Sequence, residues 1–598
     1  MKNRSIAALA TLLALALLIP TFVLAQQQQQ QEAPPDRQND MGSVRPGAPT
    51  AEPRARPPRP NLSALEGVEL DFAEALTMIQ ENYVDGDKLD YNDVFKSSII
   101  GMLRTLDPHS NFYDAKEYEE QRADWRAEYY GIGASISDYQ IGERTDTYIL
   151  STFEGAPAHR AGLRFGDRIV EVDGQSVVGK RMGEVRDKLL GPRGTAVKVT
   201  VERAGTNNRE TFDITRDAVS RPSVPDAYML RPGVGYVDMT RQFNADTADK
   251  FQEALESLRA KGMNSLVLDL RNNPGGLLDQ AVKVSEKFLQ RDLVIVSQKG
   301  RGTRGTDRPV RSTNSTPSDI PLVVLVNRNS ASASEIVAGA MQDHDRAIIV
   351  GETTFGKGLV QSITPLEYGT ALLLTTTKYL TPSGRLIQRD YSNTGYYDYI
   401  MRGLNQRGDE DGDEGAAAPP SPTPQPAKPA GPESFTDSGR TVYGGGGIAP
   451  DEAVRPRLIS PAQQRIIDPV FAFARELANG RVSGFDAYKV QRPVDYAHDL
   501  TPADFPMTDA LFKAFKDFVA ARKEYKLTAA QLDRQRDFIL RQLRYDLATA
   551  AYGTVKAQQV LVADDPQVAR GIEALPRARE LAAAASQGRN PPQKSYDE

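Results

Sequence analysis

Apolar residues recur along the 598-residue chain with different spacings, and each spacing predicts a different kind of element. From Leu65 to about Tyr129 they return at every third or fourth position, as in LDFAEALTMIQENYV, which is typical of amphipathic helices. From 130 to 216, short strands such as RIVEVDG and AVKVTVER alternate with glycine-rich turns. We therefore expect a small helical unit followed by a compact β-rich domain.

The segment 234–400 has a third pattern, in which continuous apolar runs alternate with amphipathic stretches. The runs SLVLDL, PLVVLV and AIIVG are apolar on both faces, as strands covered on both sides of a sheet must be. Strands of this kind alternating with helices predict an α/β layer architecture. Beyond about 458 the chain reads as helical and charged up to 585.

The first 25 residues resemble a secretory signal. Lys2 and Arg4 precede the apolar run IAALATLLALALLI, and VLA ending at Ala25 suits cleavage before Gln26. An uncleaved membrane anchor is the alternative, because the apolar run is long. We expect an exported protein, periplasmic or otherwise extracytoplasmic, that is either released or tethered by this segment.

Composition narrows the chemistry further. The chain has no cysteine, which excludes thiol nucleophiles and disulfides. Its net charge of -6 lacks the basic excess that nucleic-acid-binding proteins use, so we set that class of function aside. A Gln-, Pro- and Arg-rich stretch at 26–62 and an acidic, Pro-rich insertion at 403–435 hold too little apolar surface to fold, so we predict disorder for both.

The stretch SASASE at 330–335 follows the run PLVVLV and precedes a helical pattern. Ser332 with Glu335 three residues later is a capping-box pattern, so a purely structural role explains one serine. A nucleophilic role would need a base. The local sequence alone does not indicate which of the three serines would be the nucleophile.

The candidate bases are few. The chain has four histidines and no metal-binding spacing; we interpret His109 and His159 as structural, and His344 stands about one helix length past the serines. A lysine held neutral by desolvation can replace histidine, although only roughly 1 in 2,500 lysines is neutral at pH 7 when unperturbed. Lys357 in TFGKGLVQ, between two glycines and two apolar residues, is the best candidate.

The turn RNNPGG ends the apolar run SLVLDL and opens a helix. Backbone N–H groups of Gly275 and Gly276 can therefore face a cavity and bind an oxyanion, with the N–H of Ala333 as a further donor. An ordinary glycine-rich turn is the alternative.

Four segments resemble the carboxyl-terminal processing proteases, also called tail-specific proteases. Their core resembles the stretch NRNSASASEIVAGAMQDHDRAIIVGETTFGKGLVQ, and their PDZ domain resembles GAPAHRAGLRFGDRIVEVDG. Their N-terminal helical unit resembles MLRTLDPHSNFYD, and a late segment of their core resembles GGGGIAPD. The likeness therefore spans roughly 65–455. It implies Ser332 as nucleophile, Lys357 as general base and Gln361 as the residue that supports the lysine. Ser330 and Ser334 would then be structural.

The stretch YYGIGA resembles the carboxylate-binding loop of a PDZ domain. Gly131, Ile132 and Gly133 would present backbone N–H groups to a chain end, and the bound peptide would add a strand to the sheet edge. A glycine kink in a strand is the alternative reading.

The resemblance implies a multidomain α/β protein with a crotonase-like protease core, an inserted β-rich PDZ domain and helical N- and C-terminal regions. We expect a serine endopeptidase that needs no metal or organic cofactor and acts on proteins with accessible C-termini; an inactive PDZ adaptor or holdase is the alternative. Its oligomeric state is not predicted.

The expected parts are a signal peptide 1–25, a tether 26–62, an N-terminal helical unit 63–128, a PDZ domain 129–217, a core 218–402 and 436–457, an insertion 403–435 and a C-terminal helical region 458–598.

Overall fold

The computed structural model describes residues 64–126, 128–204, 208–301, 309–392, 399 and 431–589. The predicted signal peptide, the tether and most of the insertion lie outside this part. Within these ranges no helix has both the length and the apolar character needed to cross a membrane.

A six-stranded sheet forms the centre of the core. Its strands run parallel, except that the first edge strand is antiparallel to its neighbour. The middle strands are buried on both faces, as their continuous apolar sequences predict. In spatial order they are β10 (Ala227–Arg231), β11 (Val234–Asp238), β12 (Ser265–Asp269), β15 (Leu322–Val326), β16 (Ile348–Gly351) and β21 (Glu452–Ala453).

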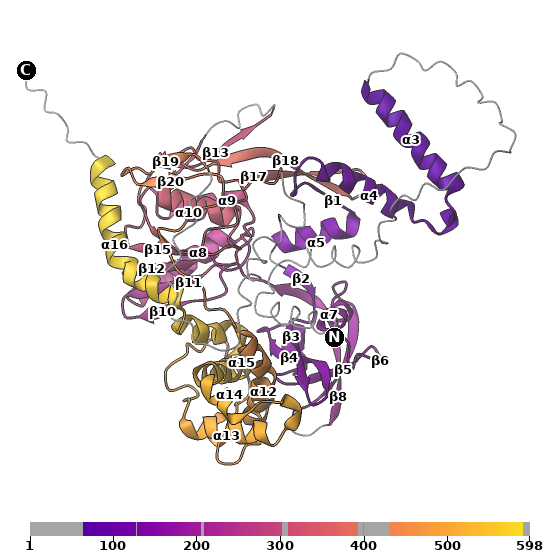
Figure 1. Cartoon of the computed structure of the whole chain (residues 1–598), viewed down its shortest axis with the longest axis vertical. Helices are drawn as coiled ribbons and strands as arrows, with labels where there is room; N and C mark the ends of the chain where they lie inside the picture. The colour runs from indigo at the N-terminus through magenta and orange to yellow at the C-terminus, as the bar shows by residue number, and fades with distance from the viewer. Residues whose placement is uncertain are drawn as a thin grey trace, which may run out of the picture.

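Helices cover both faces of this sheet (Figure 1). One face packs against α8 (Thr247–Ala260), α9 (Leu278–Glu286) and α10 (Ala333–Asp343). The other face packs against α16 (Pro566–Arg589), near the end of the chain, through residues that include Val568 and Leu575. The C-terminal region, to which the sequence assigned no role, thus completes the core.

A second sheet is built from strands that lie far apart in the sequence. Its path is β1 (Asn111–Tyr113), β18 (Ala371–Leu380), β13 (Val294–Gly300) and β14 (Val310–Arg311), with β17 (Leu359–Pro365) also paired to β18. Strand β1 belongs to the N-terminal unit, which is therefore not purely helical.

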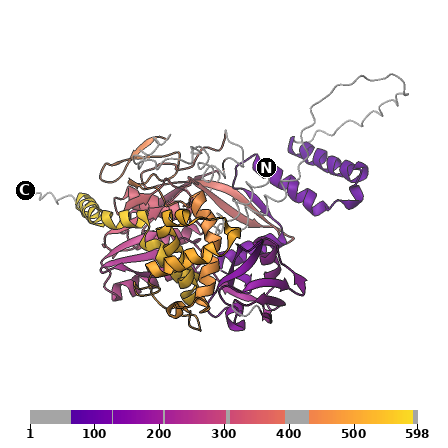
Figure 2. The same cartoon turned by 60° about the horizontal axis from the view of Figure 1, so that its bottom comes forward.

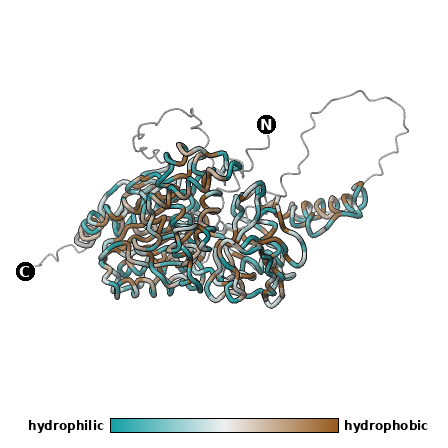
Figure 3. The backbone as a smooth tube through the Cα atoms, turned by 90° about the horizontal axis from the view of Figure 1, so that it is seen from below, coloured by the Kyte–Doolittle hydropathy of each residue, from teal (hydrophilic) through white to brown (hydrophobic). Residues whose placement is uncertain are grey.

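The rest of the N-terminal unit is helical, as predicted: α3 (Ala64–Asn82), a short 3-10 turn (Gly86–Lys88), α4 (Tyr91–Arg104) and α5 (Ala115–Trp125). Helix α3 projects away from the body of the molecule (Figures 1 and 2). Apolar and polar positions alternate along it (Figure 3), and several of its large apolar side chains are exposed.

The β-rich domain is a sheet with the order β3 (Ala134–Ile141), β4 (Arg144–Thr152), β5 (Arg168–Val172), β7 (Ala196–Glu202) and β8 (Arg209–Thr215), with β6 (Gln175–Ser176) paired to β5. Two short helices, α6 (Pro157–Ala161) and α7 (Met182–Leu189), accompany it. Strand β2 (Glu128–Gly131) pairs with β9 (Asp217–Ser220), so the ribbon that closes this domain runs slightly past the predicted limits of 129 and 217.

The C-terminal region contains α12 (Pro461–Ala478), α13 (Asp509–Ala520), α14 (Ala529–Arg534) and α15 (Arg536–Ala563), with 3-10 turns at Asp486–Tyr488 and Lys523–Tyr525. These helices share one apolar cluster with Tyr148 and Phe165 of the β-rich domain. Figure 1 shows them below the core and beside that domain.

The predicted end of the insertion needs a correction. Residues Glu433–Phe435 form strand β19, which pairs with β20 (Thr441–Tyr443), so ordered structure resumes earlier than position 436.

Candidate active site

Ser332 stands at the start of α10, in the turn that follows β15, in a strained backbone conformation. Its φ is 54° and its ψ is -113°, a region that non-glycine residues rarely occupy. Such a conformation costs about 1–3 kcal/mol and persists only where the surroundings enforce it, which happens most often at functional sites.

Exposure separates the three serines. Ser330 and Ser334 are fully buried, and their hydroxyls donate to the carbonyls of Leu270 and Asn273 at 2.8 and 3.0 Å. Ser332 alone is only partly buried. The arrangement agrees with structural roles for the outer two serines and leaves Ser332 as the one that a substrate can reach.

Glu335 connects the serine to the lysine. Its Oε2 accepts from the backbone N–H of Ser332 at 2.8 Å and of Lys357 at 2.9 Å, while Oε1 accepts from Thr354 Oγ1 at 2.5 Å and Gly356 N–H at 2.7 Å. Burial raises the pKa of this carboxyl to about 7, against the effect of these hydrogen bonds. The capping position of Glu335 was predicted, but its second role, in holding the Lys357 loop, was not.

Lys357 lies in the loop between β16 and β17. It keeps some solvent contact, yet protein surrounds its amine, and this desolvation lowers its pKa to about 8, although Glu335 and Asp107 act in the opposite direction. At pH 8 about half of such amines are neutral, so the lysine can accept a proton near physiological pH.

Gln361 lies on β17, opposite Thr375 of β18. Its side-chain amide donates to Thr375 Oγ1 at 3.1 Å, and Thr375 Oγ1 in turn donates to Asp107 Oδ1 at 3.1 Å. In the described part of the chain no hydrogen bond joins Gln361 to Lys357. The support of the lysine by Gln361 therefore stays a prediction.

His109 lies closer to the site than its structural reading implied. Its Nε2 is 3.1 Å from the hydroxyl of Tyr399, and burial together with the charges of Lys357 and Arg389 holds its pKa well below the usual range. The only sequence signal for this placement was the resemblance of LDPHS to the family's N-terminal unit.

His344 caps the far end of α10, as its spacing predicted. Its ring nitrogens lie 2.8 Å from Asp437 Oδ2 and 2.6 Å from the carbonyl of Val294. With Ser332 at the opposite end of the helix, this imidazole is badly placed to serve as its base.

Of the predicted oxyanion donors, Gly275 lies next to Ser332 and Ala333, while Gly276 packs against the backbone of Phe243. A side-chain atom added to Gly275 would lie 2.7 Å from Ser332 Cβ and 2.9 Å from the nitrogen of Ala333. However, the N–H of Gly275 already donates to Asn273 Oδ1 at 2.9 Å. The N–H of Gly275 is therefore engaged within its own turn, and the oxyanion role of all three residues remains a prediction.

The predicted peptide-binding loop leads into the free edge of the β-rich sheet. Gly131 ends β2, Ile132 is buried, and Gly133 precedes the edge strand β3 with a φ of 74°. The carbonyls of Ile132 and Gly133 accept from Ala158 and Phe153 at 2.7 and 3.0 Å, which fixes the loop.

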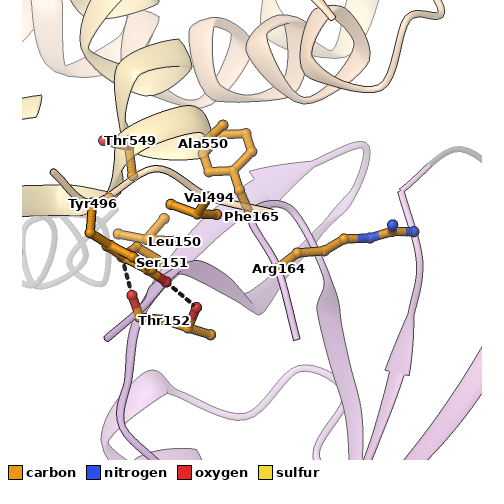
Figure 4. Close-up of a pocket in the computed structure, with 10 residues that line it drawn as sticks. Leu150, Ser151, Thr152, Arg164, Phe165, Val494, Tyr496, Thr549 and Ala550 are labelled. Carbon is orange, nitrogen blue, oxygen red and sulfur yellow. Dashed lines mark hydrogen bonds between the residues drawn. The ribbon is translucent and has the colours of Figure 1, made fainter. Parts of the chain in front are cut away.

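A small cavity lies elsewhere, where β4 meets α15 (Figure 4). Its lining includes Ser151, Arg164 and Phe165 from the β-rich domain and Tyr496 and Thr549 from the C-terminal region. None of the predicted catalytic residues lines it, so we regard it as part of a domain contact. The described residues also contain no cluster of three or more His, Asp or Glu side chains arranged to hold a metal ion.

Comparison with known proteins agrees with this architecture. The sequence model of peptidase family S41 matches residues 233–393, and a PDZ domain model matches 153–203. The carboxy-terminal-processing protease of Bartonella bacilliformis is 37% identical over 324 residues, which cover 53% of this chain and 72% of the relative. The carboxyl-terminal-processing protease of Synechocystis is 34% identical over 310 residues, covering 51% and 71%.

Among solved structures, a photosystem II D1 C-terminal processing protease is 33% identical, with coverage of 53% of this chain and 89% of that chain and a TM-score of 0.31. The sequence matches define the class as a serine-type peptidase that carries a PDZ domain. More specifically, the chain belongs to the carboxy-terminal processing proteases of peptidase family S41.

Proposed function

We propose that this protein is an exported endopeptidase that captures protein C-termini through its PDZ domain and cleaves peptide bonds with a Ser332/Lys357 dyad. Ser332 attacks the scissile carbonyl and forms an acyl-enzyme, and the neutral amine of Lys357 takes the hydroxyl proton and returns it to the leaving amine. Water then hydrolyses the ester with the lysine again acting as base.

The observation that carries the proposal is the shared oxygen of Glu335. One Oε2 atom accepts from the backbone N–H groups of both Ser332 and Lys357, so a single buried carboxylate holds the two predicted reacting residues beside each other. The strained backbone of Ser332 and the lowered pKa of Lys357 support the same assignment.

Labelling by a fluorophosphonate probe, followed by peptide mapping, tests the assignment. We expect one modified serine, Ser332, and no labelling of a Ser332→Ala variant that still binds C-terminal peptides. Ser334→Ala is the control, because it perturbs the same turn but keeps the nucleophile. An inactive adaptor or holdase would bind the peptides without labelling, and label on another serine would disprove the dyad.

Export rests on the N-terminal segment, and the mature N-terminus tests it. Cleavage by a signal peptidase predicts a chain that begins at Gln26, whereas an uncleaved anchor predicts a full-length protein in the membrane fraction.

A further inference from the structure

The turn Asp107–Ser110 of the N-terminal unit reaches into the neighbourhood of the catalytic lysine. Strand β1 follows this turn and pairs with β18, with Asn111 opposite Leu373. The hydroxyl of Ser110 accepts from the backbone N–H of Thr375 at 3.0 Å and donates to Asp107 Oδ2 at 2.7 Å. The turn is therefore fixed against the strand that carries Thr375.

Asp107, Thr375 and Gln361 form a directed chain of hydrogen bonds. Asp107 is only 6% exposed, and a carboxylate can only accept hydrogen bonds. The Thr375 hydroxyl must therefore be the donor in its hydrogen bond with Asp107. The lone pairs of that hydroxyl then face the amide NH2 of Gln361. This fixes the amide orientation and leaves the Gln361 oxygen as the free end of the chain.

This orientation is the one that a lysine base needs. A neutral amine has one lone pair, which must face the nucleophile's hydroxyl, and two N–H groups, which need acceptors. An amide that presented its NH2 group would compete for the lone pair, whereas an amide oxygen accepts an N–H and leaves the lone pair available.

The same carboxylate acts on the lysine through its charge. In the part of the chain that the structure describes, the charged or titratable groups that interact electrostatically with Lys357 are Glu335 of α10 and Asp107 and His109 of the N-terminal turn. The two carboxylates raise the pKa of Lys357, while burial lowers it by more. Removing the charge of Asp107 should therefore lower that pKa further.

We propose that Asp107 and Thr375 are positioning residues for the catalytic base, and that the N-terminal unit completes the active site by orienting Gln361 toward Lys357. The proposal rests on the proposed Ser332/Lys357 dyad. It gives the N-terminal unit a direct part in turnover, beyond its packing against the core.

Thr375→Val tests the hydrogen-bond chain, because it keeps the shape of the side chain and removes the hydroxyl. We expect kcat for a fluorogenic peptide with a free apolar C-terminus to fall about tenfold or more, with KM changed by less than about twofold. Thr375→Ser, which restores the hydroxyl, should recover most of the rate.

Thr377→Val is the matched control. Thr377 lies two residues further along β18, is buried, and donates to Gln298 Oε1 at 3.1 Å, so its loss removes a comparable hydrogen bond outside the chain that leads to Gln361. We expect this variant to lose stability to a similar extent but to keep kcat near the starting value.

Asp107→Asn tests the charge. In addition to a lower kcat, the acid limb of the rate of fluorophosphonate labelling should move to lower pH, because the lysine loses an attractive negative neighbour. A merely structural role would lower the rate without moving this limb.

Lys357→Ala, assayed in parallel, separates the two proposals. If Lys357→Ala is inactive while Thr375→Val and Asp107→Asn keep the rate and pH profile of the unmodified protein, the positioning role is wrong and the dyad stands. If Lys357→Ala stays active, the dyad fails and the positioning role fails with it.

Discussion

At the scale of single residues, the site depends on one fully buried carboxylate. Glu335 accepts four hydrogen bonds, two on each oxygen, from the serine turn and from the lysine loop. An amide has only one accepting oxygen, so glutamine would turn its NH2 group toward two donors and leave them unsatisfied. Glu335 is thus needed as a carboxylate.

We predict that Glu335→Gln lowers the free energy of unfolding by about 2 kcal/mol or more and reduces kcat at least about tenfold. Glu352→Gln is the control, because Glu352 pairs with Arg328 in a more exposed setting, where an ion pair contributes about 0–1 kcal/mol. Chemical denaturation and peptide hydrolysis measure both effects. Equal behaviour of the two variants would show that the Glu335 contacts are dispensable.

Lys357 leads to a prediction about pH. Because its pKa is lowered to about 8 and only the neutral amine is a base, kcat/KM should rise with pH through about 8 and level off above it. A histidine base of ordinary pKa would reach its plateau about 1.5 pH units lower. The pH–rate profile of a short peptide substrate distinguishes the two.

Substitution gives an independent check of the base. We expect Lys357→Ala to reduce hydrolysis of an unfolded, apolar-tailed protein about 100-fold or more, and His344→Ala to remain within a few-fold of the starting activity. The reverse ranking would replace the lysine with a histidine mechanism.

At this scale, contacts between residues far apart in the sequence could not be predicted, whereas residues within short motifs could. Ser332 and Lys357 could be proposed because each lies in a short, distinctive motif that the resemblance made specific. Thr375 and Asp107 touch across 268 positions, and nothing in either local sequence indicates the partner. The exposure that separates Ser332 from Ser330 and Ser334 is likewise a property of the folded loop.

At the scale of elements, long and strongly patterned segments were predictable and short ones were not. The strands β12, β15 and β16 were expected because their apolar runs have few alternatives to full burial. Strand β1 has three residues, and only its pairing with β18 makes it a strand. Strand β19 is also recognisable only from its pairing, and its residues fall within the predicted disordered insertion.

In the proposed capture of a chain end, the edge strand β3 is the strand with which the peptide would pair. Near its end, Tyr139 stacks on Phe471 of α12 at 3.7 Å between ring centroids, and Asp468 of α12 accepts from the backbone of Gln140. Helix α12 thus covers this end, and the open part of the edge is the part next to Gly133. We therefore expect a bound peptide to add only a short strand there, with its carboxylate at the predicted loop.

We predict that amidating the C-terminus of a substrate slows its cleavage, because the Gly131–Gly133 loop then loses the charge that its N–H groups would bind. A substrate recognised through an internal sequence should be affected less. Binding to the Ser332→Ala variant, measured for the acid and the amide, separates capture from cleavage. Equal rates and affinities for the two forms would show that the PDZ domain does not read chain ends.

At the scale of the whole molecule, the C-terminal region joins the PDZ domain to the core. Its helix α16 covers one face of the core sheet, and α12–α15 share an apolar cluster with the PDZ domain. An ion pair adds to this connection, since Arg271, the first residue of the RNNPGG turn, contacts Asp565 at 2.6 Å. This region therefore connects the PDZ domain with the core that carries Ser332.

The contact between β4 and α15 depends on a break in the helix at Gly553. Its φ of 84° and ψ of 164° lie in a region that is essentially restricted to glycine, and an added Cβ would lie 3.1 Å from the ring of Tyr496. Tyr496 in turn contacts Thr152 Oγ1 at 2.8 Å through its hydroxyl, close to the cavity in Figure 4. A substitution at Gly553 should therefore act on the domain contact itself.

We predict that Gly553→Ala costs about 1–3 kcal/mol of stability and increases amide hydrogen exchange in β4, because both the kink and the packing of Tyr496 are disturbed. Gly484→Ala is the control: Gly484 also has a positive φ, of 82°, in the C-terminal region, but an added Cβ would meet nothing within 4 Å. It should lose stability without affecting β4. Unchanged exchange in β4 of Gly553→Ala would show that this contact does not hold the PDZ domain in place.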